Sequence, residues 1–229
     1  MVSESGVSAL HGNVLTGLGQ SIVSGELAVG DVITLDGVSA GYGVSRSVAR
    51  EAIRVLESLG MIASRRRIGI TIQPETAWNV FDARVIRWRL ESGDRAEQLD
   101  SLAELRTGYL PVAAALAAQR ADPSHCRTLA AASSDIAVHA RSGDRERYLL
   151  ADKLFHDTVV DACGNSMFRG LHRLVAAAPI QQTAIPDTAV VEAYDDVARA
   201  IRHRDTATAE RSMRTIIDAD EGGLTAARA

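Results

Sequence analysis

Apolar residues recur at helical spacing in three segments near the start of the chain, and two short runs of strand-like alternation follow them. The third segment is the clearest, because Ala49, Ala52, Ile53 and Leu56 fall on one face of a helix. The first segment carries a similar stripe between residues 14 and 22, and the second spans about 35–42. Residues 61–64 and 69–73 then predict a hairpin. Three helices followed by a hairpin is the order of a winged helix-turn-helix.

From about Thr76 onward the pattern becomes almost entirely helical. Turn residues such as Asp122-Pro123 separate the predicted helices, which span about 77–91, 96–121, 123–141, 145–163, 165–179, 188–203 and 205–226. We therefore expect a mainly α fold. It comprises a winged helix-turn-helix with a small β-hairpin wing over 1–75, a linker helix over 76–95 and an all-helical bundle over 96–229 for effector binding and dimerisation. A bundle can hold a ligand site between side chains of facing helices.

Composition is that of an ordinary globular protein, with 46% hydrophobic and 24% charged residues among 229. Two cysteines, Cys126 and Cys163, are too few for a disulfide framework or a four-cysteine zinc site. No apolar run approaches the roughly 20 residues of a membrane-spanning helix, and the first residues lack the pattern of a secretory leader. We expect a cytoplasmic protein.

Positive charge gathers in one part of a chain whose net charge is −4. Between Arg46 and Arg67, six arginines and two glutamates leave an excess of four positive charges. Attraction to phosphates is screened over about 10 Å, so this local excess matters more than the total. A solvated helix face is the alternative for the helical arginines. The arginine triplet at the predicted hairpin tip favours DNA binding instead.

The stretch IVSGELAVGDVITLDGVSAGYGVSRSVAREAIRVLESLGMIASRRRIGITI resembles the DNA-binding domain of the GntR superfamily of bacterial transcription regulators. Within it, VSRSVAREAIRVLESLGMI resembles the turn, the recognition helix and the start of the wing. The resemblance implies contacts to bases or adjacent phosphates from the recognition helix and places Gly69 in the wing. In a winged helix-turn-helix, the wing reaches the neighbouring DNA backbone or the minor groove. The residues that we expect to bind DNA are Ser45, Arg46, Ser47, Arg50, Arg65, Arg66, Arg67 and Gly69, with the arginine triplet taken from the charge pattern and the others from the resemblance.

The chain departs from the family pattern at two places in this domain. Family members commonly place an arginine that contacts DNA at the start of the second helix, whereas this chain has Asp36 and Gly37 there. Arg67 lies where a glycine is common in the wing.

The order of helices over about 96–222 resembles the FCD ligand-binding domain of the FadR subfamily. ELRTGYLPVAAALAAQRA resembles its first long helix, LADKLFHDTVVDACGNSMF its central helix and AIRHRDTATAERSMRTI its closing helices. Many members hold a divalent metal through one aspartate and three histidines, beside a small carboxylate ligand. Asp152 and His156 match the first two ligands, while Tyr194 and Ile216 lie where the other two histidines are expected.

Two interpretations of this second site remain open. Asp152 and His156, four residues apart on one helix face, could keep a weak site for a zinc-like metal ion. Alternatively, the cavity is metal-free and Asp152, His156 and Tyr194 bond the effector directly, which we favour because isoleucine cannot ligate a metal. Arg106 matches a family arginine, and it is either the anchor of the effector carboxylate or part of a structural salt bridge.

The segment TAWNVFDARVIRWRLES resembles the Trp-Asn-x-x-Asp…Trp linker of members that respond to sugar acids such as gluconate or galactonate. We expect Trp78 and Trp88 to pack the DNA-binding domain onto the sensor domain. The other histidines, His125 and His172 among them, are expected at the surface or at helix ends.

The predicted function is that of a homodimeric transcription regulator with no catalytic residues. It represses a carbon-catabolism operon, binds an inverted-repeat operator and is released by a small carboxylate effector. The alternative is a metal-dependent hydrolase using Asp152 and His156. The sequence contains no phosphate-binding glycine loop or His-Glu-x-x-His segment to complete such an enzyme.

Overall fold

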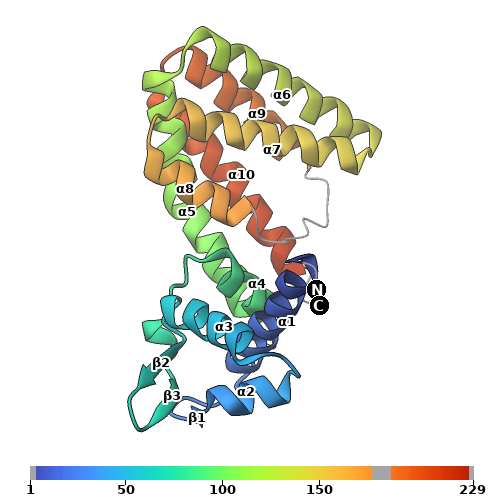
Figure 1. The fold of residues 1–229 in the computed structure, drawn as a ribbon. Coiled ribbons are helices and arrows are strands. Elements are labelled where there is room, and N and C mark those ends of the chain that lie inside the picture. The colour runs from blue at the N-terminus through green and yellow to red at the C-terminus, as the bar shows by residue number, and fades with distance from the viewer. Residues whose placement is uncertain (1–3, 177–186, 227–229) are drawn as a thin grey trace. The chain divides into compact units, whose positions relative to one another are not determined.

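The computed structural model describes residues 4–176 and 187–226, with side chains described over 12–176 and 187–219. The chain divides into two compact units, Met1–Gln98 and Leu99–Ala229 (Figure 1). Among the described residues, no helix combines the length and the apolar character needed to cross a membrane.

The first unit has the predicted winged helix-turn-helix fold (Figure 1). Its elements are α1 (Glu4–Val23), β1 (Val32–Ile33), α2 (Leu35–Gly41), α3 (Arg46–Ser58), β2 (Ile62–Arg65), β3 (Gly69–Ile72), a short 3-10 helix (Glu75–Ala77) and α4 (Ala83–Glu91). The sheet has three antiparallel strands in the order β1-β3-β2. The sequence pattern predicted the hairpin but missed β1, because two residues are too few to show alternation.

Helix α3 forms where the apolar spacing predicts it. Ser45 caps its start, since the side-chain oxygen accepts a hydrogen bond from the Val48 backbone N–H. The residues of its apolar face are buried against α1 and the sheet: Ala49, Ala52, Ile53 and Leu56. The chain leaves the helix through Gly60, whose φ is 73°. A Cβ there would lie 2.1 Å from the Ala77 carbonyl oxygen, so only glycine fits.

Both tryptophans pack within the first unit. Trp88 on α4 is 2% exposed and belongs to the same apolar core as α1 and α3. A Cβ on Gly19 of α1 would come within 2.6 Å of its indole ring. Trp78 packs against this core and donates a hydrogen bond from Nε1 to the Gln73 carbonyl oxygen at 3.0 Å. The segment 76–95, expected to be a linker, therefore contributes to the first unit's own core.

The second unit is a helical bundle. Its helices are α5 (Arg95–Arg120, which begins at the end of the first unit), α6 (Pro123–Ser142), α7 (Arg145–Ala162), α8 (Ser166–Ala176), α9 (Thr188–Arg202) and α10 (Thr206–Ala226). Each agrees with a predicted segment to within a few residues, except that the predicted end of 165–179 lies outside the described residues. Alanines at 113, 114, 117 and 118 are fully buried on α5, which lets the neighbouring helices approach closely.

The boundaries of α6 follow from capping chemistry. Asp122 and His125 form a reciprocal capping box around Pro123, which has no N–H to satisfy. Gly143 ends the helix with a φ of 74°. His125 therefore has the helix-end position that the sequence suggested.

Candidate functional site

The exposed face of α3 carries the side chains expected to contact DNA. The N-cap Ser45 and the first helical residues Arg46, Ser47 and Arg50 are all exposed, whereas Ala49 and Ala52 are buried. The Ser45 hydroxyl accepts the helix-capping hydrogen bond with its oxygen, so its proton can still be donated to a phosphate. The expected groups are thus all accessible near the start of α3, as contact with a major groove requires.

Arg46 is held in place by an acid on the preceding helix. Its Nε lies 2.6 Å from Asp36 Oδ1 and its Nη2 lies 2.7 Å from Oδ2. Asp36 lies in the first turn of α2, so this two-point contact links the two helices of the helix-turn-helix. Sequence reasoning noted Asp36 only as a departure from the family pattern and did not predict the pair.

The tip of the wing displays Arg65, Arg66 and Arg67 to solvent. A hydrogen bond from the Ile68 N–H to the Arg65 carbonyl oxygen closes the turn, and Arg67 adopts a left-handed φ of 69°. Gly69 has a different task. A Cβ on it would lie 2.7 Å from Val32 Cγ1, so glycine lets β1 pair with β3. A direct role of Gly69 in DNA binding stays a prediction.

In the second unit, Asp152, His156 and Tyr194 form one hydrogen-bonded cluster between α7 and α9. The Tyr194 hydroxyl donates to Asp152 Oδ1 at 2.6 Å, and His156 Nδ1 lies 3.1 Å from the same oxygen. Tyr194 is fully buried, and the side chains of His156 and Asp152 are 4% and 14% exposed. Tyr194 also meets Phe155 edge to face, with ring centroids 5.1 Å apart. The cluster is therefore set in an apolar wall.

Electrostatics keep Asp152 ionised despite its position. Burial by itself would raise the pKa of this carboxyl group. The charge and hydrogen bond of His156, the hydrogen bond of Tyr194 and the positive charge of Arg106 outweigh burial, and the pKa of Asp152 is lowered. Arg106, on α5, therefore acts on the same carboxylate, and the four residues predicted to bind the effector belong to one electrostatic environment.

The donor set does not fit the four-ligand metal site that the family resemblance implies. Tyr194 donates its proton to Asp152, whereas a ligand would direct an oxygen lone pair at a metal ion. Ile216 is fully buried and has no donor atom. Within the described part of the chain, no three histidine, cysteine, aspartate or glutamate side chains are grouped to hold a metal ion. Asp152 and His156 by themselves leave two of four positions unfilled.

A second polar chain, which the sequence did not reveal, passes through His172 on α8. The Tyr109 hydroxyl lies 2.9 Å from His172 Nδ1, and His172 Nε2 lies 2.9 Å from Asp157 Oδ1. Asp157 also pairs with Lys153, with Nζ and Oδ2 2.5 Å apart. The expectation of a surface or helix-end position for His172 is wrong, since its side chain is only 12% exposed and it lies within α8. Its partners come from α5 and α7, so no local pattern indicates them.

The protonation state of His172 follows from its surroundings. Burial comes first, and with the positive charges of His156 and Arg106 it outweighs the attraction of Asp157, so the pKa of His172 falls to about 4. The ring is therefore neutral at pH 7. Nδ1 accepts the proton of the Tyr109 hydroxyl and Nε2 donates to Asp157.

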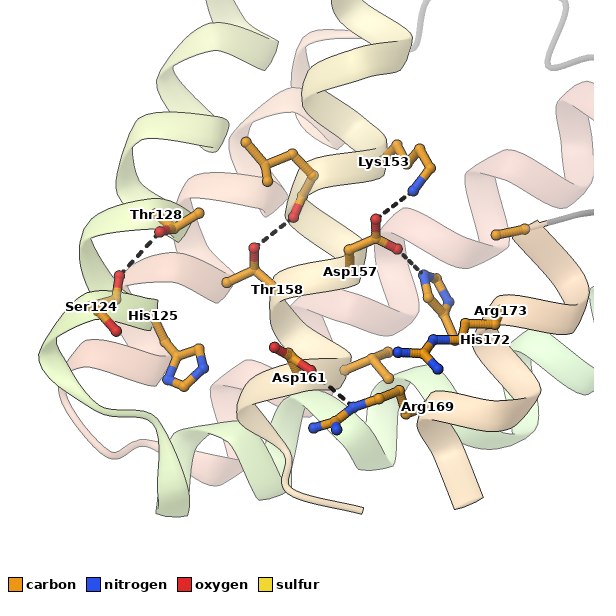
Figure 2. Close-up of a pocket in the computed structure, with 13 residues that line it drawn as sticks. Ser124, His125, Thr128, Lys153, Asp157, Thr158, Asp161, Arg169, His172 and Arg173 are labelled. Atoms are coloured by element: carbon orange, nitrogen blue, oxygen red, sulfur yellow. Dashed lines mark hydrogen bonds and ion pairs between the residues drawn. The ribbon is translucent and has the colours of Figure 1, made fainter. Parts of the chain in front are cut away.

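His172 also borders an open pocket of about 650 Å³ between α6, α7 and α8 (Figure 2). Figure 2 shows Lys153 and Asp157 on α7, and the pair formed by Asp161 and Arg169. The acids and bases of this pocket largely neutralise each other. His172 is the side chain that joins its lining to the buried hydroxyl of Tyr109.

Comparison with known proteins identifies both parts of the chain. Residues 10–72 match the family "Bacterial regulatory proteins, gntR family", and residues 101–219 match the FCD domain. The uncharacterized HTH-type transcriptional regulator YieP of Escherichia coli K12 is 29% identical over 153 residues. That alignment covers 65% of each protein, so the chain matches about two thirds of the length of this relative.

Solved structures agree on the fold. A Streptococcus agalactiae GntR protein matches with a TM-score of 0.51 and 23% identity, over 91% of this chain and 97% of that one. Lar, which controls expression of the Listeria monocytogenes agr system, matches with a TM-score of 0.57 and 16% identity, over 94% and 96%. At these identities the likeness is one of fold.

Proposed function

Because this chain belongs to the gntR family of bacterial regulatory proteins and carries an FCD domain, we propose that it is a homodimeric repressor of a carbon-catabolism operon. A small organic acid of the gluconate or galactonate type binds the second unit and releases the repressor from DNA. The family is one of DNA-binding transcription regulators and not of enzymes. The effector, the operon and the sign of regulation are the new parts of the proposal.

The observation that carries the effector proposal is the cluster of Arg106, Asp152, His156 and Tyr194. A cationic guanidinium and an ionised carboxylate act on each other at the edge of an apolar wall. A hydroxy acid complements this pair, because its carboxylate can bond to Arg106 while a hydroxyl group donates to Asp152. A simple carboxylate without hydroxyl groups would instead be repelled by Asp152. This reasoning favours sugar acids over short fatty acids.

Release from DNA requires the effector to prefer one arrangement of the dimer. Two recognition helices related by a two-fold axis match successive major grooves only when their separation is about one helical turn, or about 34 Å. An acid that binds more tightly to an arrangement with another separation shifts the population away from the DNA-bound form. Tyr194 on α9 and Asp152 on α7 are the groups through which such a ligand would change the packing of the bundle.

A thermal-shift screen of aldonates, uronates, lactate and short dicarboxylates, with and without chelator, tests the effector site. We expect an aldonate or uronate to raise the melting temperature equally in both conditions. The Arg106→Gln and Tyr194→Phe variants should lose this shift. Stabilisation that requires a metal ion, or that is unaltered in both variants, would contradict the proposed metal-free site.

A gel-shift experiment on the upstream region of the protein's own gene tests operator binding and its release by the effector. We expect salt-dependent binding to an inverted repeat, and release by the same acid that raises the melting temperature. The alternative of a hydrolase at Asp152 and His156 gains no support, because the described residues group no third ligand with these two side chains to hold a metal ion.

A further inference from the structure

An acidic side chain lies on the surface with which this family reads DNA. Asp36 is the second residue of α2 and contacts Arg46, the first residue of α3, at two points. Both side chains are about two-thirds exposed, at 68% and 66%. An ion pair this exposed adds little to folding stability, since water competes for both charges. A contribution to folding stability therefore does not explain why this ion pair is present.

The two-point geometry leaves part of Arg46 available. Asp36 takes the edge of the guanidinium formed by Nε and Nη2. The N–H groups that point away along the end of the fork, on Nη1 and Nη2, can still donate to two acceptors. Guanine presents such a pair, O6 and N7, in the major groove. Asp36 can thus stay bound to Arg46 while Arg46 contacts a base.

The pair of Asp36 and Arg46 also weakens contacts to the phosphates of DNA, which carry no sequence information. Phosphates attract any nearby cation, and this attraction supplies most of the non-specific affinity for DNA. Asp36 offsets the charge of Arg46 and itself repels phosphates within a Debye length, about 10 Å. A guanidinium bound to Asp36 must also give up this contact before it can turn toward a phosphate oxygen.

We propose that Asp36 is a specificity-determining residue of the DNA-reading surface. It orients Arg46 for a base edge and lowers the affinity of that surface for DNA of arbitrary sequence. The proposal rests on the DNA-binding function stated above. It assigns Asp36 a positioning role, since it acts through Arg46.

The test compares two duplexes of equal length. One is selected by the wild-type protein from a random library, and the other has a scrambled sequence. Affinity is measured by fluorescence anisotropy at several salt concentrations for wild type and Asp36→Ala. We expect Asp36→Ala to bind the scrambled duplex several-fold more tightly, with a salt slope steeper by about one. The ratio of selected to scrambled affinity should fall by about two- to fivefold, the range that an exposed ion pair can supply, because Arg46 is then no longer oriented toward a base.

Two further variants separate positioning from a general charge effect. Glu51→Gln removes one negative charge from another exposed acid–arginine pair, that of Glu51 with Arg54 on α3. It should leave the affinity ratio near that of wild type. In an Arg46→Ala background, Asp36→Ala should no longer change the ratio. Circular dichroism and unfolding curves confirm that each variant is folded.

The outcomes against the proposal are distinct. Asp36 does not set specificity through Arg46 if Asp36→Ala changes the affinities for the selected and the scrambled duplex by the same factor. The same conclusion follows if Asp36→Ala still changes the affinity ratio in the Arg46→Ala background. If the wild-type protein enriches no sequence from the library and binds no duplex, the DNA-binding function itself fails, and the inference fails with it.

Discussion

The hydroxyl group of Tyr194 on α9 lies 2.6 Å from Oδ1 of Asp152 on α7 and donates a hydrogen bond to it. This bond joins two helices of the bundle through a buried carboxylate. It gives the second unit a polar contact on which both stability and ligand binding should depend.

Removing this donor should destabilise the second unit. We expect Tyr194→Phe to lower the free energy of unfolding by about 1–3 kcal/mol at pH 7, because a buried carboxylate loses one of its donors. The lowered pKa of Asp152 contributes stability above about pH 4, and this contribution is lost as the pH falls through the folded-state pKa. Tyr194→Phe should make that acid loss smaller. Urea unfolding between pH 3 and pH 7 measures both effects, and a variant as stable as wild type at pH 7 would contradict the prediction.

His172 should make the bundle less stable in mild acid. Its pKa is about 4 when folded and about 6.5 in an unfolded chain, so its stabilising contribution is complete above pH 6.5 and is lost as the pH falls toward 4. The loss is at most about 3 kcal/mol. His172→Gln keeps a donor and an acceptor but cannot titrate, and should flatten the stability curve between pH 6.5 and 4. His203→Gln, at an exposed histidine, is the control. An unchanged curve for His172→Gln would refute the assignment.

The recognition helix should bind base edges through its two leading arginines. We expect Arg46→Ala and Arg50→Ala each to weaken binding to the selected duplex by about 1–3 kcal/mol, the range for one bidentate bond between an arginine and a base. Anisotropy titrations measure the effect. If both variants bind the operator as tightly as wild type does, α3 does not contact DNA as predicted.

The contact between Gly19 and Trp88 should tolerate no larger residue. A Cβ at Gly19 would overlap an indole that is 2% exposed, so Gly19→Ala should cost about 1–3 kcal/mol despite the better helix propensity of alanine. Gly12→Ala on the same helix meets nothing within 4 Å and should stabilise the protein by up to about 1 kcal/mol. Thermal unfolding of the pair provides the check, and equal effects at the two glycines would count against the packing described for α4.

The backbone conformation of Arg67 in the wing should lower the stability of the first unit. Arg67 has a φ of 69°, which glycine adopts without strain, so Arg67→Gly should stabilise the first unit by about 0.5–1 kcal/mol. The variant also loses a cation, and its salt slope for DNA binding should fall by about one if Arg67 contacts a phosphate. Chemical unfolding and salt titrations test the two statements separately. A less stable variant would show that Arg67 makes compensating contacts.

Elements were predictable where the signal is local. The apolar spacing from Ala49 to Leu56 predicted α3, and the pairing of Asp122 with Pro123 predicted the start of α6. The family pattern pointed to Asp152, His156 and Tyr194, which the structure places in one cluster. In each case the information lies within a few residues or in a known motif.

Contacts between distant segments left no such signal. His172 and Tyr109 lie 63 residues apart, and nothing in either segment indicates that the two side chains meet. The family resemblance placed Trp88 in a linker. Its packing against Gly19 of α1 left no signal, because a glycine has no side chain that a sequence pattern could show. Asp36 was noticed only for the arginine it replaces, since an ion pair between two helices depends on the angle at which they cross.

His172 is bonded by one ring nitrogen to α5 and by the other to α7, although it belongs to α8. A shift of α8 by one residue turns its side chains by about 100°, which breaks both bonds together. Turning the ring away from its present orientation therefore breaks two hydrogen bonds at once. A ligand in the adjoining pocket that competed for Asp157 would remove one of these two bonds and weaken the attachment of α8 to α7.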